Sequence, residues 1–284
     1  MKMFFFGLGF SARALAPLLA ERGFDLAATT RTDGSDIPDG ITAVPFDGSA
    51  ALPDGALQGV THVLSSVPPG DDGDPVLNRC LDSLAGLPGL RWAGYLSTTG
   101  VYGDRQGDWV DETGALRPVG RRGERRVQAE QQWLTLQDRI GGAVQIFRLA
   151  GIYGPGRNNL AGLRAGTARR IVKPGQVFSR IHVADIAQVL LASIDRPERG
   201  GIYNVCDDEP APPQDVVEFA ARLAGLPVPP DTPFDTADLS PMARSFYGES
   251  KRVRNDRIRR DLGVELKYPN YRDGYRAIVA GESD

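Results

Sequence analysis

The sequence is short of three chemically versatile residues: lysine, cysteine and histidine. Only four of its 33 basic residues are lysine (Lys2, Lys173, Lys251 and Lys267), so the other 29 are arginine. Any reaction that requires a lysine amine therefore has four candidates. Two cysteines cannot form a disulfide framework for a chain of 284 residues. Two histidines, without a Cys/His cluster at ligand spacing, argue against a zinc site, and we expect no metal.

Long apolar runs are also missing, since none approaches the length of a membrane span. The apolar N-terminal segment could pass for a signal peptide, but regularly spaced glycines interrupt it. Cys80 and Cys206 each lie in an apolar run and are expected to be buried thiols. We therefore expect a cytoplasmic protein that does not bind membranes.

The overall composition is that of an ordinary folded protein. Apolar residues make up 41% and charged residues 24% of the chain, which argues against disorder and against a fibrous protein. The formal net charge of −3 argues against general nucleic-acid binding, which needs a basic surface. A chain of this length suits one large domain or two modest ones.

Short apolar runs alternate along the chain with longer amphipathic runs. The expected strands cover residues 2–6, 25–29, 41–46, 61–67, 92–97, 143–149 and 202–205. The expected helices cover residues 11–22, 75–86, 121–137, 183–196, 213–224 and 255–262. Apolar strands that alternate with helices are typical of a parallel sheet covered on both faces. The sequence therefore predicts a doubly wound α/β fold.

Glycine and proline indicate where several helices begin and end. Gly23, Gly225 and Gly263 each follow an expected helix, and Pro213 suits the first turn of one. Pro17 fits its helix badly, because a proline inside a helix removes a backbone hydrogen bond and bends the helix.

The character of the sequence changes after about residue 206. Residues 207–213 and 227–241 are rich in proline and acidic residues and show no clear periodicity, which predicts loops of a smaller, less regular lobe. Asp207-Asp208-Glu209 could suggest a cation site. Pro210 and the lack of further oxygen ligands at suitable spacing favour a solvated loop instead.

A glycine-rich turn joins the first expected strand to the first helix. This turn, Gly7-Leu8-Gly9-Phe10-Ser11-Ala12, has the G-x-G-x-x-G/A spacing of the dinucleotide-binding fingerprint. Gly7 would permit the tight turn, Gly9 would let a pyrophosphate approach the backbone, and Ala12 would allow close helix–strand packing. The phosphates would lie on free N–H groups at the positive end of the helix. The alternative is an ordinary strand–helix turn.

The end of the second strand indicates which cofactor is bound. A carboxylate there would accept the ribose 2′-hydroxyl of NAD, whereas an arginine favours the 2′-phosphate of NADP. The sequence has no carboxylate at this strand end and places Arg31 just beyond it. We therefore prefer NADP over NAD, because guanidinium and phosphate groups pair well. The alternative is that Arg31 is a solvated loop residue.

Four later segments resemble those of a known family. They are Leu96-Ser97-Thr98-Thr99-Gly100-Val101-Tyr102-Gly103, Arg148-Leu149-Ala150-Gly151-Ile152-Tyr153-Gly154-Pro155-Gly156-Arg157, Arg180-Ile181-His182-Val183-Ala184-Asp185-Ile186-Ala187 and Gly201-Ile202-Tyr203-Asn204-Val205. In this order they resemble the extended short-chain dehydrogenase/reductases, which are NAD(P)-dependent sugar-nucleotide epimerases and dehydratases. The resemblance extends from Met1 to about Ala277. It implies a Rossmann domain (1–155, rejoined by 178–205), a smaller substrate lobe (156–177 and 206–284) and, at family level, a homodimer.

The same resemblance implies further site residues at strand ends. For the cofactor they are Asp47 and Gly48 at the adenine, Ser65, Ser66, Val67 and Pro68 at the ribose and nicotinamide, and Leu149, Gly151 and Tyr153 at the nicotinamide. Thr98 matches the catalytic Ser/Thr that hydrogen-bonds a substrate oxygen. Ser66 and Thr98 could instead be plain strand-end hydroxyls, and Tyr153 a core aromatic.

The sequence departs from the family at its central catalytic pair, Tyr-x-x-x-Lys. Alignment on Asp111-Glu112-Thr113, Pro118 and Ala129-Glu130 places the tyrosine at Arg122 and the lysine at Arg126. An arginine cannot replace the tyrosine, because it has no acceptor and stays protonated. Arg126 could still hold the ribose hydroxyls, and Arg122 could bind an anionic group of the substrate. The four arginines at 121, 122, 125 and 126 fit a helix face turned toward an anionic cofactor.

One Tyr-x-x-x-Lys does occur, at Tyr247-Gly248-Glu249-Ser250-Lys251, but it lies in the expected substrate lobe. Its position argues against the catalytic pair, although either residue could reach the substrate side of a cleft. Substitute proton donors are Tyr102, Tyr153, Glu124 and His182. His182 has a suitable intrinsic pKa, yet it opens a helix, so a capping or packing role is an equal alternative.

Two functions therefore remain open. The first is an NAD(P)-dependent oxidoreductase, epimerase or dehydratase that acts on a polar small molecule, with a sugar nucleotide as one candidate. The second is a cofactor-binding sensor or partner-binding module without turnover, suggested by the missing Tyr/Lys pair.

Overall fold

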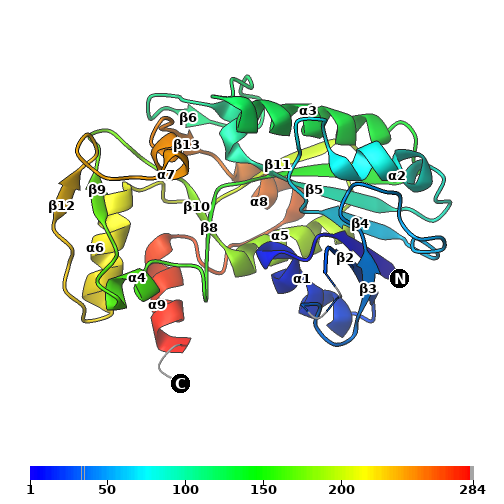
Figure 1. Cartoon of the computed structure of the whole chain (residues 1–284), viewed down its shortest axis with the longest axis horizontal. Coiled ribbons are helices and arrows are strands. Elements are labelled where there is room, and N and C mark those ends of the chain that lie inside the picture. The colour runs from blue at the N-terminus through cyan, green and yellow to red at the C-terminus, as the bar shows by residue number, and fades with distance from the viewer. Residues whose placement is uncertain (33, 35, 282–284) are drawn as a thin grey trace.

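A parallel seven-stranded sheet forms the centre of the molecule (Figure 1). The computed structural model describes residues 1–32, 34 and 36–281. The sheet has the order β11-β7-β5-β4-β1-β2-β3, and every pairing in it is parallel. Its strands are β1 (Lys2–Phe6), β2 (Asp25–Thr30), β3 (Ile41–Pro45), β4 (His62–Ser65), β5 (Trp92–Thr98), β7 (Ala143–Leu149) and β11 (Gly201–Val205). The predicted doubly wound α/β fold is confirmed.

The first strand, β1, is almost wholly apolar because both faces of the sheet are covered there. In β1, Met3 and Phe5 pack into a core cluster on one face, while Phe4 and Phe6 pack into a second cluster on the other. All four side chains are fully buried. A strand buried on both faces has no polar side to alternate with, which is why the sequence shows continuous apolar runs here.

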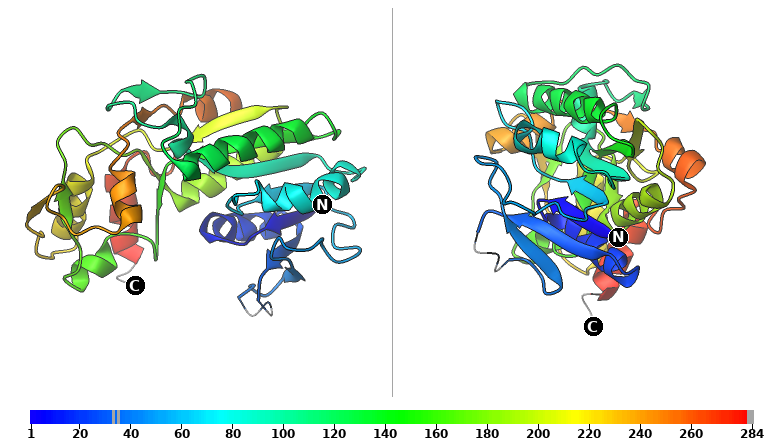
Figure 2. Two further views of the ribbon diagram at one scale, coloured as in Figure 1. Left: turned by 45° about the horizontal axis from the view of Figure 1, so that its top comes forward. Right: turned by 90° about the vertical axis from the view of Figure 1, so that its right-hand side faces the viewer.

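Two pairs of helices cover the two faces (Figure 2). α1 (Phe10–Glu21) and α5 (Val183–Asp195) supply the first core cluster, and α2 (Pro75–Ala85) and α3 (Arg121–Leu136) supply the second. The predicted glycine ends of α1, α6 (Pro213–Leu223) and α8 (Asp256–Leu262) are confirmed. α1 continues through the exposed Pro17, and the bend expected there remains a prediction.

Short elements build the remainder of the chain, and the sequence pattern did not predict them. They are η1 (Thr99–Tyr102), β6 (Trp109–Val110), β8 (Gly151–Tyr153), α4 (Leu160–Arg164), β9 (Arg170–Val172), β10 (Arg180–His182), β12 (Asp231–Pro233), α7 (Pro241–Phe246), β13 (Arg252–Val253) and α9 (Tyr271–Gly281). α4, α6 and α9 enclose a third core cluster together with Tyr153, and these helices lie at the opposite end of the molecule from β3 (Figure 1). The predicted division into two domains remains a prediction.

A buried ion pair joins α3 to the sheet. The Arg148 guanidinium on β7 and the Glu130 carboxylate on α3 lie 2.8 Å apart, and both side chains are at most 3% exposed. Ser97 on β5 donates its hydroxyl to the same carboxylate at 2.5 Å. Arg148 also donates to the Tyr102 hydroxyl at 2.8 Å, and Tyr102 donates to Asn204 on β11 at 2.7 Å. This network therefore ties three strands, η1 and α3 together at one edge of the sheet.

We predict that breaking this ion pair destabilises the protein strongly. Arg148→Met leaves the Glu130 carboxylate buried without its cation, which costs about 3–5 kcal/mol. The double variant Arg148→Met/Glu130→Leu removes both charges and should lose less. Urea unfolding of the three proteins measures these differences. As a control, Arg139→Ala breaks an exposed pair with Asp82 and should cost less than about 1 kcal/mol. An Arg148→Met variant as stable as this control would contradict the prediction.

Candidate functional site

The glycine-rich turn lies at the carboxyl end of β1, where the loops of a parallel α/β sheet form its ligand crevice. Gly7 has a φ of +79°, a conformation that disfavours other residues. A Cβ atom on Gly7 would also lie 3.0 Å from Ser66 Oγ. The Gly7 N–H donates to Thr29 Oγ1 at 2.8 Å, which fixes the turn against β2. The fold itself therefore requires glycine at position 7.

Gly9 is different, because the fold does not require it. Its φ of −78° and ψ of −173° are ordinary extended values. A Cβ atom there would come no closer than 3.8 Å to its nearest neighbour, Ser66 Oγ. Gly9 is the N-cap of α1 and provides no side-chain cap for it. The missing side chain thus leaves open space directly in front of the first turn of α1.

The next residues place one aromatic ring and two small side chains beside this space. Ser11 and Ala12 are buried against the sheet, as the close packing of the fingerprint demands. The half-buried Phe10 ring lies under the guanidinium of Arg157, 5.6 Å from its Cζ atom. Arg157 has no recognisable role in the sequence alone, because only folding brings the residues after β8 onto α1.

Arg31 lies where it was predicted, just after β2. It is exposed, and within the described residues it forms no hydrogen bond or ion pair. The neighbouring hydroxyls of Thr30 and Thr32 both donate to the Asp36 carboxylate at 3.1 Å. Arg13 on α1 reaches the same aspartate at 3.8 Å. The loop therefore engages its own carboxylate and leaves the Arg31 cation available.

The predicted residues after β3 and β4 adjoin the turn in part. Ser66 donates its hydroxyl to the Gly7 carbonyl at 2.9 Å, and Val67 lies against the same glycine. The Asp47 carboxylate accepts the backbone N–H and the hydroxyl of Ser49, and these hydrogen bonds lower its pKa. Gly48 lies in a left-handed turn against Pro75. Ser65 has a buried Oγ that finds no hydrogen-bond partner among the described residues, and Pro68 is exposed.

Thr98 ends β5 and opens η1. Its Oγ1 accepts the Gly100 N–H at 3.1 Å, which leaves the hydroxyl hydrogen free to donate. The backbone of Gly123 on α3 faces this turn, because a Cβ atom there would lie 3.4 Å from the Gly100 carbonyl oxygen. The predicted nicotinamide contacts occupy the end of β7 and the start of β8: Leu149 and Tyr153 are buried, and Gly151 is exposed.

The four arginines of α3 do not share one role. Arg121 and Arg125 both pair with the Asp71 carboxylate. Arg126 donates to the Leu96 carbonyl at 2.6 Å and to the Tyr95 hydroxyl at 3.0 Å, so its side chain lies along β5. Arg121 and Arg125 are therefore held by a carboxylate, and one helix face turned toward the cofactor remains a prediction. A ribose contact for Arg126 remains a prediction.

Burial makes the tyrosines near this edge poor acids. It raises the pKa of Tyr102 to about 12, and the hydroxyl is already held by Arg148 and Asn204. Burial also raises the pKa of Tyr153, whose ring stacks on Tyr275. The hydroxyl of Tyr153 lies 3.5 Å from the Asn270 carbonyl.

The Tyr-x-x-x-Lys segment, Tyr247 to Lys251, is engaged in packing. Tyr247 lies against the rings of Phe178 and Phe234, and burial raises its pKa. The Lys251 ammonium forms an ion pair with Glu249 at 2.5 Å, and its side chain is 10% exposed. These contacts agree with the expectation that the segment is not the catalytic pair.

His182 is the N-cap of α5, as the capping alternative predicted. Its Nδ1 accepts the Ala184 N–H at 3.2 Å, and its ring lies between Tyr153 and Tyr268. Burial lowers its pKa to about 4, so the ring is neutral at physiological pH. Nearby, burial raises the pKa of Asp185 to about 6, although its carboxylate accepts two backbone N–H groups.

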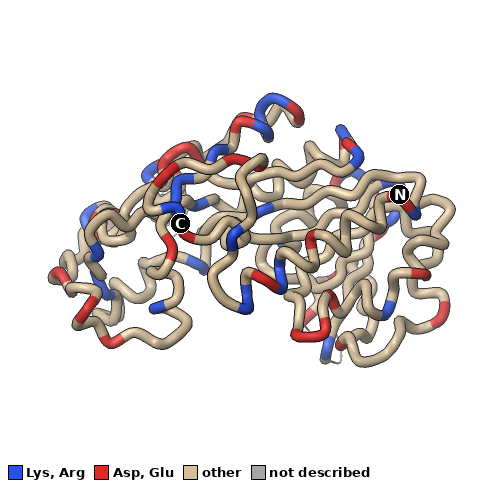
Figure 3. The backbone as a smooth tube through the Cα atoms, turned by 90° about the horizontal axis from the view of Figure 1, so that it is seen from above, with Lys and Arg blue, Asp and Glu red and all other residues tan. Residues whose placement is uncertain are grey.

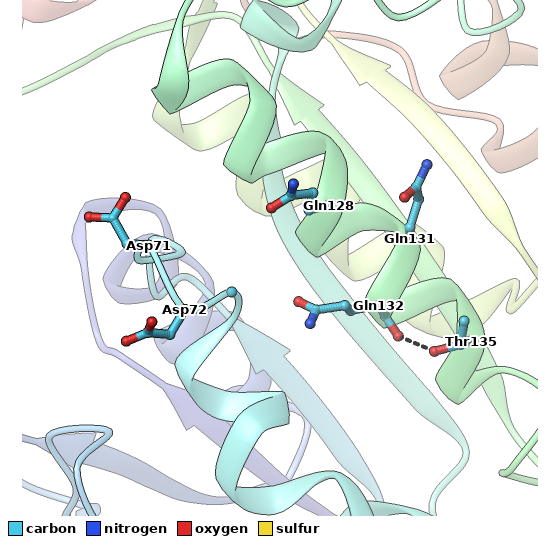
Figure 4. A pocket seen from close by; sticks show the side chains of 7 residues that line it. Asp71, Asp72, Gln128, Gln131, Gln132 and Thr135 are labelled. Carbon is cyan, nitrogen blue, oxygen red and sulfur yellow. Dashed lines mark hydrogen bonds between the residues drawn. The ribbon is translucent and has the colours of Figure 1, made fainter.

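A separate polar hollow of about 550 Å³ lies between the loop before α2 and the outer side of α3 (Figure 4). Its lining residues are Asp71, Asp72, Gly73, Gln128, Gln131, Gln132 and Thr135. It contains none of the predicted cofactor residues. It is therefore distinct from the glycine-rich turn at Gly9.

The charged side chains of the described residues do not indicate a second candidate site. Basic and acidic residues are interspersed along the described backbone (Figure 3). In that part of the chain, no group of three or more His, Cys, Asp or Glu residues could hold a metal ion. Cys80 and Cys206 are buried free thiols, as expected. No described helix is both long enough and apolar enough to span a membrane.

Among known sequences, the chain has a curated relative that it matches over part of its length. No protein-family model matches the chain. Protein YeeZ of Escherichia coli K12 is 34% identical over 181 residues, which are 62% of this chain. The match spans 58% of the length of this curated relative.

Solved structures match over the whole chain. A functionally unknown conserved protein from Silicibacter pomeroyi is 53% identical, with a TM-score of 0.90 over 100% of this chain and 99% of that one. MoeE5, solved with UDP-glucuronic acid and NAD, is 18% identical with a TM-score of 0.80 over 99% and 98%. The human epimerase family protein SDR39U1, solved with NADPH, is 16% identical with a TM-score of 0.77 over 99% of each chain. The chain therefore belongs to the family of the Silicibacter pomeroyi protein, and its fold is that of the extended short-chain dehydrogenase/reductases, the NAD-dependent epimerases and dehydratases.

Proposed function

We propose that this protein binds NADP(H), in preference to NAD(H), and uses it in an oxidoreductase, epimerase or dehydratase reaction on a polar small molecule. Gly9 carries the proposal, because neither its backbone angles nor its neighbours require glycine. A ligand that approaches the backbone does require it. The MoeE5 and SDR39U1 structures, which hold NAD and NADPH in this fold, support a nicotinamide cofactor.

Different residues of this chain would bind different parts of the cofactor. The turn from Gly7 to Ala12 would receive the pyrophosphate, and Arg31 would pair with the 2′-phosphate. Ser66 and Val67 hold the turn in place from β4. The bound cofactor would supply hydride transfer, while the protein supplies orientation and polarity. The Thr98 hydroxyl would donate to a substrate oxygen and would thereby fix the reacting carbon.

A second function, cofactor binding without turnover, is favoured by one observation. Every phenol or imidazole suggested as a substitute proton donor is held in packing or hydrogen bonds, with a pKa far from neutral. Glu124, the remaining candidate, is exposed on the first turn of α3. A protein of this kind would sense the cofactor's concentration or redox state.

We predict that Gly9→Ala weakens cofactor binding without unfolding the protein. The added Cβ fits the folded chain but occupies the space for the pyrophosphate, so NADPH affinity measured by calorimetry should fall at least about tenfold. The melting temperature should remain that of the wild type. Unchanged NADPH affinity would refute the cofactor site.

We predict that Arg31→Ala weakens NADPH binding about tenfold and NADH binding little, because only NADPH offers the 2′-phosphate. Arg91 is a matched control. It is also exposed, and it precedes β5, at the opposite end of the sheet. Arg91→Ala should leave both affinities unchanged. Equal losses for the two cofactors would assign Arg31 another role.

We predict that Thr98→Ala lowers turnover about 100-fold in an NADPH-oxidation screen of carbonyl compounds and UDP-sugars, because an oriented hydroxyl is lost. Thr98→Ser keeps both the hydroxyl and the cap of η1, so it should retain most activity. Tyr247→Phe should have no effect. Cofactor binding with no turnover on any compound would favour the sensor. Loss of turnover in Tyr247→Phe would instead identify that tyrosine as catalytic.

We predict that His182 makes the protein less stable as the pH falls from 6.5 toward 4. The unfolded chain binds a proton at an ordinary histidine pKa of about 6.5, whereas folded His182 resists protonation down to about 4. His182→Asn keeps an N-cap but removes this titration. The stability difference between wild type and variant should therefore change by about 3 kcal/mol between neutral pH and pH 4. A difference independent of pH in urea unfolding would show that His182 titrates normally.

A further inference from the structure

The first two turns of α3 carry four arginines, and the structure neutralises or engages three of them. Asp71 pairs with Arg121 and Arg125. Arg126 donates to a carbonyl and a hydroxyl of β5. Arg122 has neither a hydrogen bond nor an ion pair within the described residues. Glu124, the acidic residue of the same turn, forms no ion pair with it.

An uncompensated cation here is unfavourable for the isolated helix. Arg122 and Arg126 are like charges four residues apart, which destabilises a helix slightly. Both also lie in the first two turns, where the helix dipole disfavours positive charge. Arg122 is exposed, so it does not repay this cost by packing into the core. Its charge is therefore available for something outside the folded chain.

The side chain of Arg122 contacts Phe246, which ends α7. Its Cζ atom lies 5.6 Å from the centre of the Phe246 ring, on α7. α7 buries none of its side chains, and Phe246 is 52% exposed. A guanidinium that lies on an aromatic face still has its N–H groups free at the edge to meet an oxyanion.

The backbone that follows Arg122 lies beside the turn of Thr98. A Cβ atom on Gly123, the next residue, would lie 3.4 Å from the Gly100 carbonyl oxygen, and the Gly100 N–H donates to Thr98 Oγ1. The first turn of α3 and the Thr98 turn therefore adjoin each other. A substrate held by Thr98 would lie within the field of the Arg122 charge.

We propose that the substrate of this protein is an oxyanion, a carboxylate or a phosphate, that Arg122 binds while its guanidinium lies on Phe246. This inference rests on the proposed function for the identity of the site, because it places the anion beside Thr98. The interaction is a charge-assisted, two-pronged hydrogen bond, the geometry in which arginine exceeds lysine.

Calorimetry on NADP⁺-loaded protein tests the proposal, with malonate and inorganic phosphate as probes and uncharged malonamide as the reference. Loading with NADP⁺ keeps the probes out of the cofactor's own phosphate sites. The wild type should bind malonate or phosphate, and the stronger of the two identifies the anion. Arg122→Ala should weaken that binding at least about tenfold, and Arg122→Lys should retain part of it.

Arg121→Ala is the matched control, since Arg121 is adjacent, also exposed and already paired with Asp71. It should bind the anion as the wild type does. Equal affinity in Arg122→Ala, an equal loss in Arg121→Ala, equal binding of malonamide, or no anion binding by the wild type would each overturn the proposal. Failure of the proposed function is seen separately, as absence of NADP⁺ binding during loading. Arg122→Ala should leave NADP⁺ affinity unchanged.

Discussion

The buried pair of Arg148 and Glu130 is the constraint on which the edge of this sheet depends. Two charges can leave water only if nearly every donor and acceptor finds a partner. Ser97, Tyr102 and Asn204 supply those partners from three separate elements. Satisfying one ion pair therefore sets α3 at a fixed height against β5, β7 and β11. The Thr98 turn and the first turn of α3 belong to the elements that this network joins, so the ion pair helps to determine the position of the candidate site.

The same constraint removes Tyr102 from the chemistry. Its hydroxyl accepts from Arg148 and donates to Asn204, which uses both of its principal hydrogen-bonding capacities. A phenol that completes a buried network stabilises the scaffold and cannot also exchange a proton with a substrate. Tyr153 and His182 are likewise enclosed by aromatic rings. Rigidity at this edge and the scarcity of proton donors are thus two consequences of one packing arrangement.

The sequence predicted the central fold well, because strands buried on both faces leave apolar runs, as in β1. Three-residue strands such as β8 and β10 could not be predicted, since a segment that short has no period and depends on its partner. The glycine turn and Arg31 were recognisable because local spacing determines them. The role of Arg157 was not, because it depends on a contact with Phe10 across the fold. The contrast between Gly7 and Gly9 also required coordinates, since both are the same letter in the fingerprint.

The four arginines at the start of α3 have different partners, which their spacing in the sequence does not reveal. Four cations at a helix start suggested one anion-binding face, yet Asp71 and β5 engage three of them. What distinguishes Arg122 is the absence of compensation, which only the neighbours of each residue reveal. An arginine stays protonated at any working pH. The resemblance to the family aligns its catalytic tyrosine and lysine with Arg122 and Arg126, and it therefore implies two permanent charges in their place. A reaction beside the Thr98 turn would therefore draw its proton from the substrate, from solvent or from Glu124. The constant contribution of the protein would be a fixed positive electrostatic field. Such a field acts most strongly on a substrate that carries negative charge or develops it in the transition state.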